Sequence, residues 1–173
     1  MAPITVAIAA EARRRASCRR LLERENGITL VGEARPGRES LVALARLRPG
    51  VLLLDFARSR LDTLVRLAEI RRRTPRTKVI LLTTRRTSDA LILEALHRGA
   101  RGYLDATAAP VLLAKAVRAV HAGQAWVSRR LGSKIRDRLL HLAAAERKAR
   151  RGRIASIRPA RSSRRAWSHG AAS

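Results

Sequence analysis

The chain has 173 residues, enough for one domain and a tail, and 46% of them are hydrophobic, enough to fill a core. The apolar runs are far shorter than a membrane span, so the sequence predicts no membrane partner. A lone cysteine and four scattered histidines exclude an internal disulfide and a recognisable structural zinc site. No signal-peptide pattern opens the chain, and a cytoplasmic location is therefore expected.

The formal net charge of +25, from 38 basic and 13 acidic residues, is the unusual feature of the composition. Such a balance is typical of proteins that bind nucleic acid or another polyanion. Two observations weaken that interpretation. All but four of the basic residues are arginines, which GC-rich codons also produce, and the charge is spread along the whole chain.

Apolar periodicity predicts five strands alternating with five helices. The strands are expected at 4–9, 28–34, 51–54, 79–82 and 102–104. The helices are expected at about 13–25 and 39–46, from Leu61 to before Pro75, around Leu91 and Ala95 up to Gly99, and from Leu113 to Gly123. In the first helix, Cys18, Leu21 and Leu22 are expected to face inward, and Arg13, Arg14, Arg19 and Arg20 mostly outward. Because three of the strands are apolar almost throughout, the pattern predicts a parallel sheet covered by helices on both faces.

Polar residues follow several of these strands. They are the Ala10-Glu11 pair, Asp55, the Thr83-Thr84 pair and the Asp105-Ala106 pair. In doubly wound sheets, functional groups gather beyond the carboxyl ends of the strands. The sequence therefore predicts that any site lies at this edge, where Asp55 is placed to act as a nucleophile or a metal ligand.

The C-terminal part of the chain differs from the rest. A helix is predicted at about 129–148, with a narrow apolar stripe of Leu131, Ile135, Leu139 and Leu142. Beyond it the composition is mostly Arg, Ser, Ala and Gly, which is too poor in apolar groups to fold. We therefore divide the chain into a domain at 1–125, a helical linker at 126–147 and a basic, disordered tail at 148–173. His97, His121, His141 and Trp126 are interpreted as structural.

Several motifs in order resemble the receiver domain of response regulators of the NarL/FixJ type, over about residues 4–130. They include Val31-Gly-Glu-Ala34, Arg48-Pro49, Asp55, Thr83-Thr84, Gly99-Ala-Arg-Gly-Tyr-Leu104 and Ala119-Val-His-Ala-Gly123. The resemblance implies a flavodoxin-like α/β fold with the parallel strand order 2-1-3-4-5. It implies that Asp55 accepts a phosphoryl group from a histidine kinase, that Thr83 and Tyr103 form the switch, and that Glu11 and Asp55 are the matching Mg²⁺ ligands.

The sequence departs from that family at several pocket positions. The acidic pair that holds Mg²⁺ in the family is Ala10-Glu11 here, and the family's pocket lysine is replaced by Ala106. Loss of a carboxylate weakens a Mg²⁺ site, so weak binding at most is expected, with Asp55 phosphorylated weakly or not at all. Arg58, Arg85 and Arg86 lie near the expected pocket mouth, where they either attract an anion or remain solvated loop charges.

The family continues into a DNA-binding domain of the LuxR type. In this chain, the segment Leu142-Ala-Ala-Ala-Glu-Arg147 faintly resembles the start of that domain. The likeness ends there, and no helix-turn-helix is predicted in the remaining residues. A truncated or out-of-frame gene end is one explanation. The other is a basic arm that contacts a polyanion through Lys148, Arg150, Arg151, Arg153, Arg158, Arg161, Arg164 and Arg165.

These observations favour an atypical response regulator rather than an enzyme. It would act in two-component signalling linked to transcription, through protein–protein contacts with a histidine kinase or another signalling protein. A homodimer and non-specific binding to nucleic acid stay open. The alternative functions are a polybasic nucleic-acid-binding protein that keeps only the receiver fold, or a decayed regulator.

Overall fold

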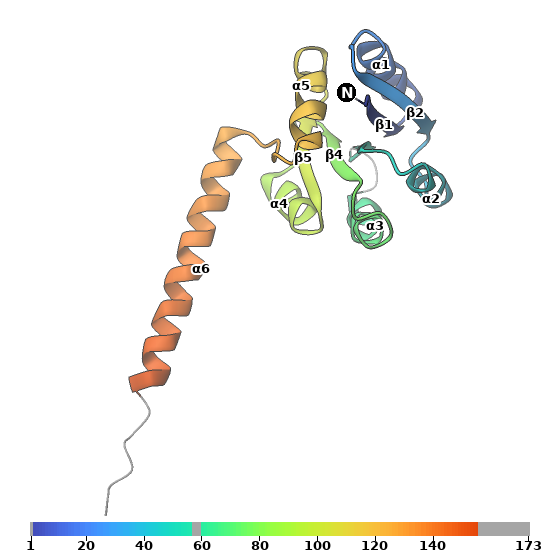
Figure 1. Cartoon of the computed structure of the whole chain (residues 1–173). Coiled ribbons are helices and arrows are strands. Elements are labelled where there is room, and N and C mark those ends of the chain that lie inside the picture. Colours follow the sequence, from blue (N-terminus) through green and yellow to red (C-terminus); the bar gives the residue numbers. More distant parts are fainter. Residues whose placement is uncertain (1, 57–59, 156–173) are drawn as a thin grey trace, which may run out of the picture. The chain divides into compact units, whose positions relative to one another are not determined.

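A computed structural model describes residues 2–56 and 60–155 of the chain (Figure 1). Five parallel strands form one sheet in the order β2-β1-β3-β4-β5. They are β1 (Ile4–Ala9), β2 (Ile28–Ala34), β3 (Val51–Asp55), β4 (Lys78–Thr83) and β5 (Ala100–Asp105). The predicted strand order is confirmed, and β5 is longer than its short apolar core suggested.

Helices cover both faces of the sheet. They are α1 (Ala12–Leu22), α2 (Arg38–Arg46), α3 (Arg60–Arg73), α4 (Asp89–His97) and α5 (Ala109–His121). Residues of α1 and α5 pack with one side of the strands, and residues of α2, α3 and α4 with the other. The first helix ends at Leu22, before the predicted position, and the turn that follows uses Gly27 with φ +77°.

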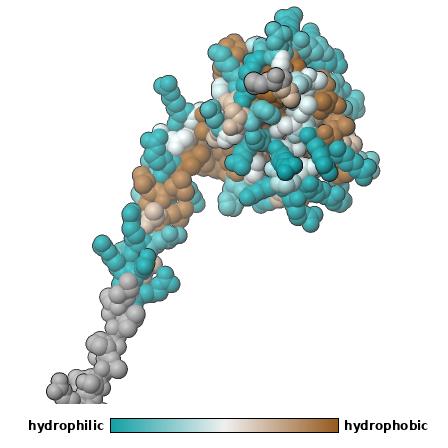
Figure 2. Space-filling model, viewed as in Figure 1, coloured by the Kyte–Doolittle hydropathy of each residue, from teal (hydrophilic) through white to brown (hydrophobic). Residues whose placement is uncertain are grey.

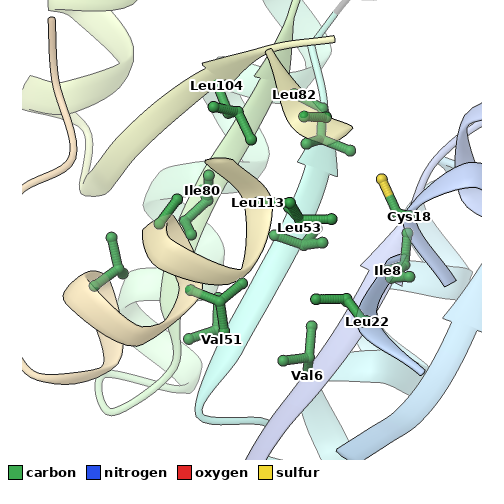
Figure 3. Packing of buried hydrophobic residues seen from close by; sticks show 14 of the residues in the cluster. Val6, Ile8, Cys18, Leu22, Val51, Leu53, Ile80, Leu82, Leu104 and Leu113 are labelled. Atoms are coloured by element: carbon green, nitrogen blue, oxygen red, sulfur yellow. The ribbon is translucent and has the colours of Figure 1, made fainter. Parts of the chain in front are cut away.

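The core is aliphatic, as the scarcity of aromatic residues predicts. Side chains alternate along each strand, so Val6 and Ile8 face α1 and α5 while Ala7 and Ala9 face α2. Figure 3 shows the first cluster, in which Leu53 lies among its neighbours from β1, β4 and α5. Both faces of β3 are therefore buried, and its terminal Asp55 is held on a rigid strand.

The outer edge of β5 is covered by the segment that follows α5. Trp126 accepts a backbone hydrogen bond from Tyr103 and donates one to Arg101, each 3.0 Å long. This backbone passes so close to Gly102 that a Cβ there would lie 2.6 Å from the Trp126 carbonyl oxygen. A glycine is therefore required, and the segment removes an open sheet edge.

The chain divides into two compact units, with the boundary after Gly132. Helix α6 (Arg129–Ala155) begins in the first unit, where Leu131 is completely buried. In the second unit, Leu139, Leu140 and Leu142 are 60%, 60% and 54% exposed, and Figure 2 shows an apolar band on this helix. The helix continues to Ala155, so 148–155 is helical rather than disordered as predicted. The prediction for 156–173 lies outside the described residues.

Candidate functional site

Polar groups from three strand ends meet at the carboxyl edge of the sheet. Asp55 ends β3 and pairs with Leu82 of β4, so the following residue Thr83 lies beside it. Asp55 is 6% exposed and Thr83 is 1% exposed. Glu11, which precedes α1, points its backbone N–H at Asp55 Oδ2 across 3.5 Å. The structure therefore brings together three of the residues that the sequence predicted for the site.

A fourth residue at this edge was not predicted. Arg14, in the first turn of α1, places its Nη1 atom 2.9 Å from Asp55 Oδ1. The same nitrogen donates to the Leu82 carbonyl oxygen at 3.1 Å. The Arg14 side chain is only 21% exposed and that of Asp55 only 5%, so this is a largely buried ion pair.

The expectation that Arg14 faces solvent is wrong for a geometric reason. Arg14 precedes Cys18 by one helical turn, and Cys18 belongs to the buried face of α1. A helical side chain leans toward the N-terminus of its helix, which here is the end beside Asp55. Arg14, Cys18 and Leu22 are spaced by four residues and so share one face of α1. This spacing is the signal from which an inward-facing Arg14 could have been predicted.

A cavity of about 360 Å³ opens beside Asp55, between α1 and the start of α5. Its lining includes Glu11, Arg13, Arg14, Cys18, Asp55 and Ala106. Burial raises the pKa of the Cys18 thiol from 9.0 to about 11, and Asp55 adds to the increase while Arg14 opposes it. The thiol is therefore protonated at neutral pH and is not a nucleophile for this cavity.

The groups around Asp55 do not fit a Mg²⁺ site. Mg²⁺ requires oxygen ligands in octahedral geometry, and Ala10 offers no side-chain oxygen. The guanidinium of Arg14 already lies on the Asp55 carboxylate and would repel a second cation. Within the described ranges, no cluster of three or more metal-ligating side chains is found.

The two expected switch residues differ in their surroundings. Thr83 is buried at the end of β4, and its carbonyl oxygen accepts a hydrogen bond from Ala106 N at 3.1 Å. Tyr103 is half-buried, and its hydroxyl donates to Ser128 Oγ at 2.8 Å. Ser128 Oγ also accepts from Leu131 N at 3.2 Å, which caps the first turn of α6. Tyr103 is thus bonded to the start of α6 and not to the cavity.

The remaining predicted residues lie apart from the cavity or outside the described chain. Arg85 and Arg86 are exposed in the turn after β4. Arg58 is among the residues whose placement is not described, as are Arg158, Arg161, Arg164 and Arg165. The other predicted tail contacts lie exposed on α6; they are Lys148, Arg150, Arg151 and Arg153. Trp126 has the structural role expected of it.

A buried carboxylate at the end of the third strand of a 2-1-3-4-5 sheet defines a receiver-like α/β protein. The family model for the response regulator receiver domain matches residues 8–118. Response regulator UvrY from Escherichia coli K12 is 34% identical over 114 residues, which are 66% of this chain and 52% of UvrY. Response regulator GacA from Pseudomonas protegens is 31% identical over 116 residues, 67% of this chain and 54% of GacA.

Solved structures agree with these matches. The signal receiver domain of the response regulator NarL from Mycobacterium tuberculosis superposes with a TM-score of 0.65 and 26% identity, covering 72% of this chain and all of that domain. The chain therefore belongs to the response regulator receiver family and is a component of two-component signalling. It spans about half the length of the curated relatives it matches.

Proposed function

We propose that this chain is an atypical response regulator that acts through protein–protein contacts, with Asp55 phosphorylated weakly or not at all. The observation that carries the proposal is the guanidinium of Arg14, 2.9 Å from the Asp55 carboxylate. Relatives named as a response regulator and as a transcriptional activator support a link to transcription. The partners we expect are a histidine kinase or another signalling protein, and a second copy of the chain.

Arg14 supplies from within the chain the positive charge that a metal ion supplies in a complete pocket. A fixed cation of this kind neutralises the Asp55 carboxylate and occupies one of its oxygen atoms. Attack on a phosphodonor needs a free carboxylate oxygen, and the new phosphoryl group needs cations around it. Because Ala106 replaces the family's pocket lysine, the described pocket offers Arg14 and Arg13 alone as cations.

In this proposal, signals leave the receiver through Tyr103. Its hydroxyl bond to Ser128 joins β5 to the cap of α6, and Arg130 Nη2 forms an ion pair with Asp89 Oδ1 at 2.9 Å. A partner that moves the β5 side chain would break the Ser128 bond and loosen the first turn of α6. No catalytic step is assigned to the chain, which we interpret as a signalling protein and not an enzyme.

The test is incubation with acetyl phosphate and Mg²⁺, followed by intact-mass spectrometry. We expect little labelling of the natural chain. The matched control is the triple variant Arg14→Met, Ala10→Asp, Ala106→Lys, which restores the missing pocket groups and should gain labelling. Rapid, stoichiometric labelling of the natural chain that Asp55→Asn abolishes would contradict the proposal.

Binding to nucleic acid is the second candidate, and the exposed basic groups of α6 favour it. Lys148, Arg150, Arg151 and Arg153 lie on this helix, in a chain with a net charge of +25. Contacts to phosphates would be sequence-independent and steeply dependent on salt. With the eight basic residues predicted for 148–173, the slope of log K against log salt should be no steeper than about −7.

Two unrelated duplexes and a salt series separate this function from the first. Equal binding to both duplexes, lost on deletion of 148–173, supports it. A strong preference for one duplex that survives high salt would contradict it. A cytoplasmic location suits either role, and none of the described helices is long and apolar enough to cross a membrane.

A further inference from the structure

A second, basic cavity lies at the opposite edge of the sheet from Asp55. It has a volume of about 590 Å³ and is lined by the end of α3, the loop before β4, and the starts of β4 and β5. Its apolar wall includes Leu67, Ile70 and Val79, all buried, and the half-buried Leu96. Volumes of about 300–1,000 Å³ are typical of sites for small molecules.

Arginines line the rest of this cavity. Arg71, Arg76 and Arg101 are exposed at its rim, and none of them has an ion pair with a described residue. A neighbouring hollow of about 620 Å³ shares Arg71 and adds Arg72 and Arg98. The acidic residue in this hollow is Glu94, and Arg98 Nε holds it at 2.6 Å. We call the two hollows together the cationic trough. Its arginines are Arg71, Arg72, Arg76, Arg98 and Arg101, and its acidic residue Glu94 is neutralised by Arg98.

Arg71 lies between the two hollows, beside the glycine that ends the turn after α4. Gly99 has a φ of +117°, and a Cβ there would lie 2.9 Å from Arg71 Cδ. The Arg71 side chain therefore lies across the turn between α4 and β5, where a larger residue would displace it. Arg71 lines both hollows, so its guanidinium can reach a ligand that occupies either of them.

We propose that this trough is a binding site for a nucleoside polyphosphate. Guanidinium groups recognise phosphate oxygens through paired, charge-assisted hydrogen bonds, and Arg71, Arg72, Arg76 and Arg101 are placed to supply them. The half-buried Leu96, beside the buried floor of Leu67, Ile70 and Val79, gives the base or sugar its apolar contact. Because the trough uses none of the residues around Asp55, this proposal is independent of the proposed function.

A small ligand fits this trough better than a nucleic acid does. The cations surround a recess between α3 and α4, whereas the phosphates of a duplex follow a long, regular surface. A duplex would also leave the apolar wall uncovered. The enclosed apolar group and the adjacent phosphate-binding arginines match a ligand that carries both kinds of group in one small molecule.

The experiment is calorimetric titration of the full chain with ATP, inorganic tripolyphosphate and adenosine, in buffer with EDTA. We expect saturable binding of ATP at one site, with tripolyphosphate weaker and adenosine weaker still. The variant Arg71→Gln/Arg101→Gln should weaken ATP binding by roughly tenfold or more. The matched control, Arg24→Gln/Arg46→Gln, removes the same charge from the turn after α1 and from the end of α2, and should change affinity by less than about twofold.

The possible results separate the site from general charge effects. An equal loss in both double variants, no saturable binding, or tripolyphosphate binding as tightly as ATP would overturn the proposal. A short duplex that displaces ATP at equal phosphate concentration would assign the trough to nucleic acid and overturn it too. If the double variant has a lowered melting temperature, Arg76→Gln, in the loop before β4, is the second variant. It should weaken ATP binding without lowering the melting temperature.

Discussion

Arg14→Met tests whether the guanidinium of Arg14 is the internal counter-ion of Asp55. Methionine keeps much of the side-chain length and apolar stem but removes the charge. Removing one partner of a fully buried pair costs about 3–5 kcal/mol, because it leaves the other charge unpaired. Arg14 is 21% exposed and Asp55 borders a cavity of about 360 Å³, where water can replace part of the lost contact. We therefore expect a loss of about 2 kcal/mol in the free energy of unfolding.

Urea unfolding of four chains measures this contact: the natural chain, Arg14→Met, Asp55→Asn and the double variant. The double-mutant cycle should give a coupling free energy of about 1–2 kcal/mol. The matched control is Arg13→Met, an exposed neighbour in the same cavity wall, which should stay within about 0.5 kcal/mol of the natural chain. Mg²⁺ should stabilise Arg14→Met more than the natural chain, because the bound ligand shifts the unfolding equilibrium. Additive single effects, or equal losses for Arg13→Met and Arg14→Met, would refute the reasoning.

Three other predictions concern the packing around the sheet. Tyr103→Phe should destabilise the fold by about 0.5–1 kcal/mol and speed hydrogen exchange in the first turn of α6, because Ser128 loses one hydrogen bond. Unchanged exchange would show that Tyr103 and α6 are uncoupled. The Cys18 thiol has its pKa raised from 9.0 to about 11, so it favours the folded state below pH 9 and this contribution is lost as pH rises to 11. The loss, at most about 3 kcal/mol, should be absent from Cys18→Ala, and identical pH profiles would contradict it. Gly102→Ala should lower the free energy of unfolding by about 1–3 kcal/mol and expose Trp126 to solvent. Tryptophan fluorescence in a Trp167→Phe background reports this exposure. An unshifted emission spectrum would mean that the Trp126 segment moves without leaving β5.

The sheet and one edge of the site could be predicted because they depend on local patterns. Apolar runs at 51–54 and 79–82 define strands buried on both faces, and Asp55 and Thr83 follow from where those runs end. A parallel sheet then brings both residues to the same edge whatever the loops do. These predictions needed no contact between particular side chains.

Arg14 was missed because a long charged side chain is amphipathic. Its stem lies along α1 near Cys18, and its head reaches Asp55, which lies far away in sequence. Hydropathy assigns such a residue to solvent, since it does not record which partner the head meets. The covering of β5 by Trp126 was hidden for a related reason, since its backbone bonds leave no pattern in the side chains.

At the end of α6, composition predicted less structure than the chain has. Composition predicted disorder from Lys148 onward, because arginines bury little apolar surface, yet the helix continues to Ala155. Arginine and alanine have high helix propensity, so a helix can extend without a core to pack against. The segment therefore presents its basic groups on a helix, whose phosphate contacts would still be sequence-independent where no side chain reaches a base edge.

The departures in the pocket are consistent with one another. Ala10 removes a carboxylate that would need a metal, and Arg14 supplies a positive charge to the one that remains buried. If Arg14 were present beside a complete acidic pair, Mg²⁺ and the guanidinium would compete for Asp55. If Ala10 were present without Arg14, the buried Asp55 carboxylate would lose the guanidinium that lies 2.9 Å from its Oδ1 atom. Arg14 therefore neutralises the buried Asp55 carboxylate in a pocket where Ala10 and Ala106 supply no charged side chain. This interdependence argues that the altered pocket is a coherent state of the receiver fold rather than a set of unrelated losses.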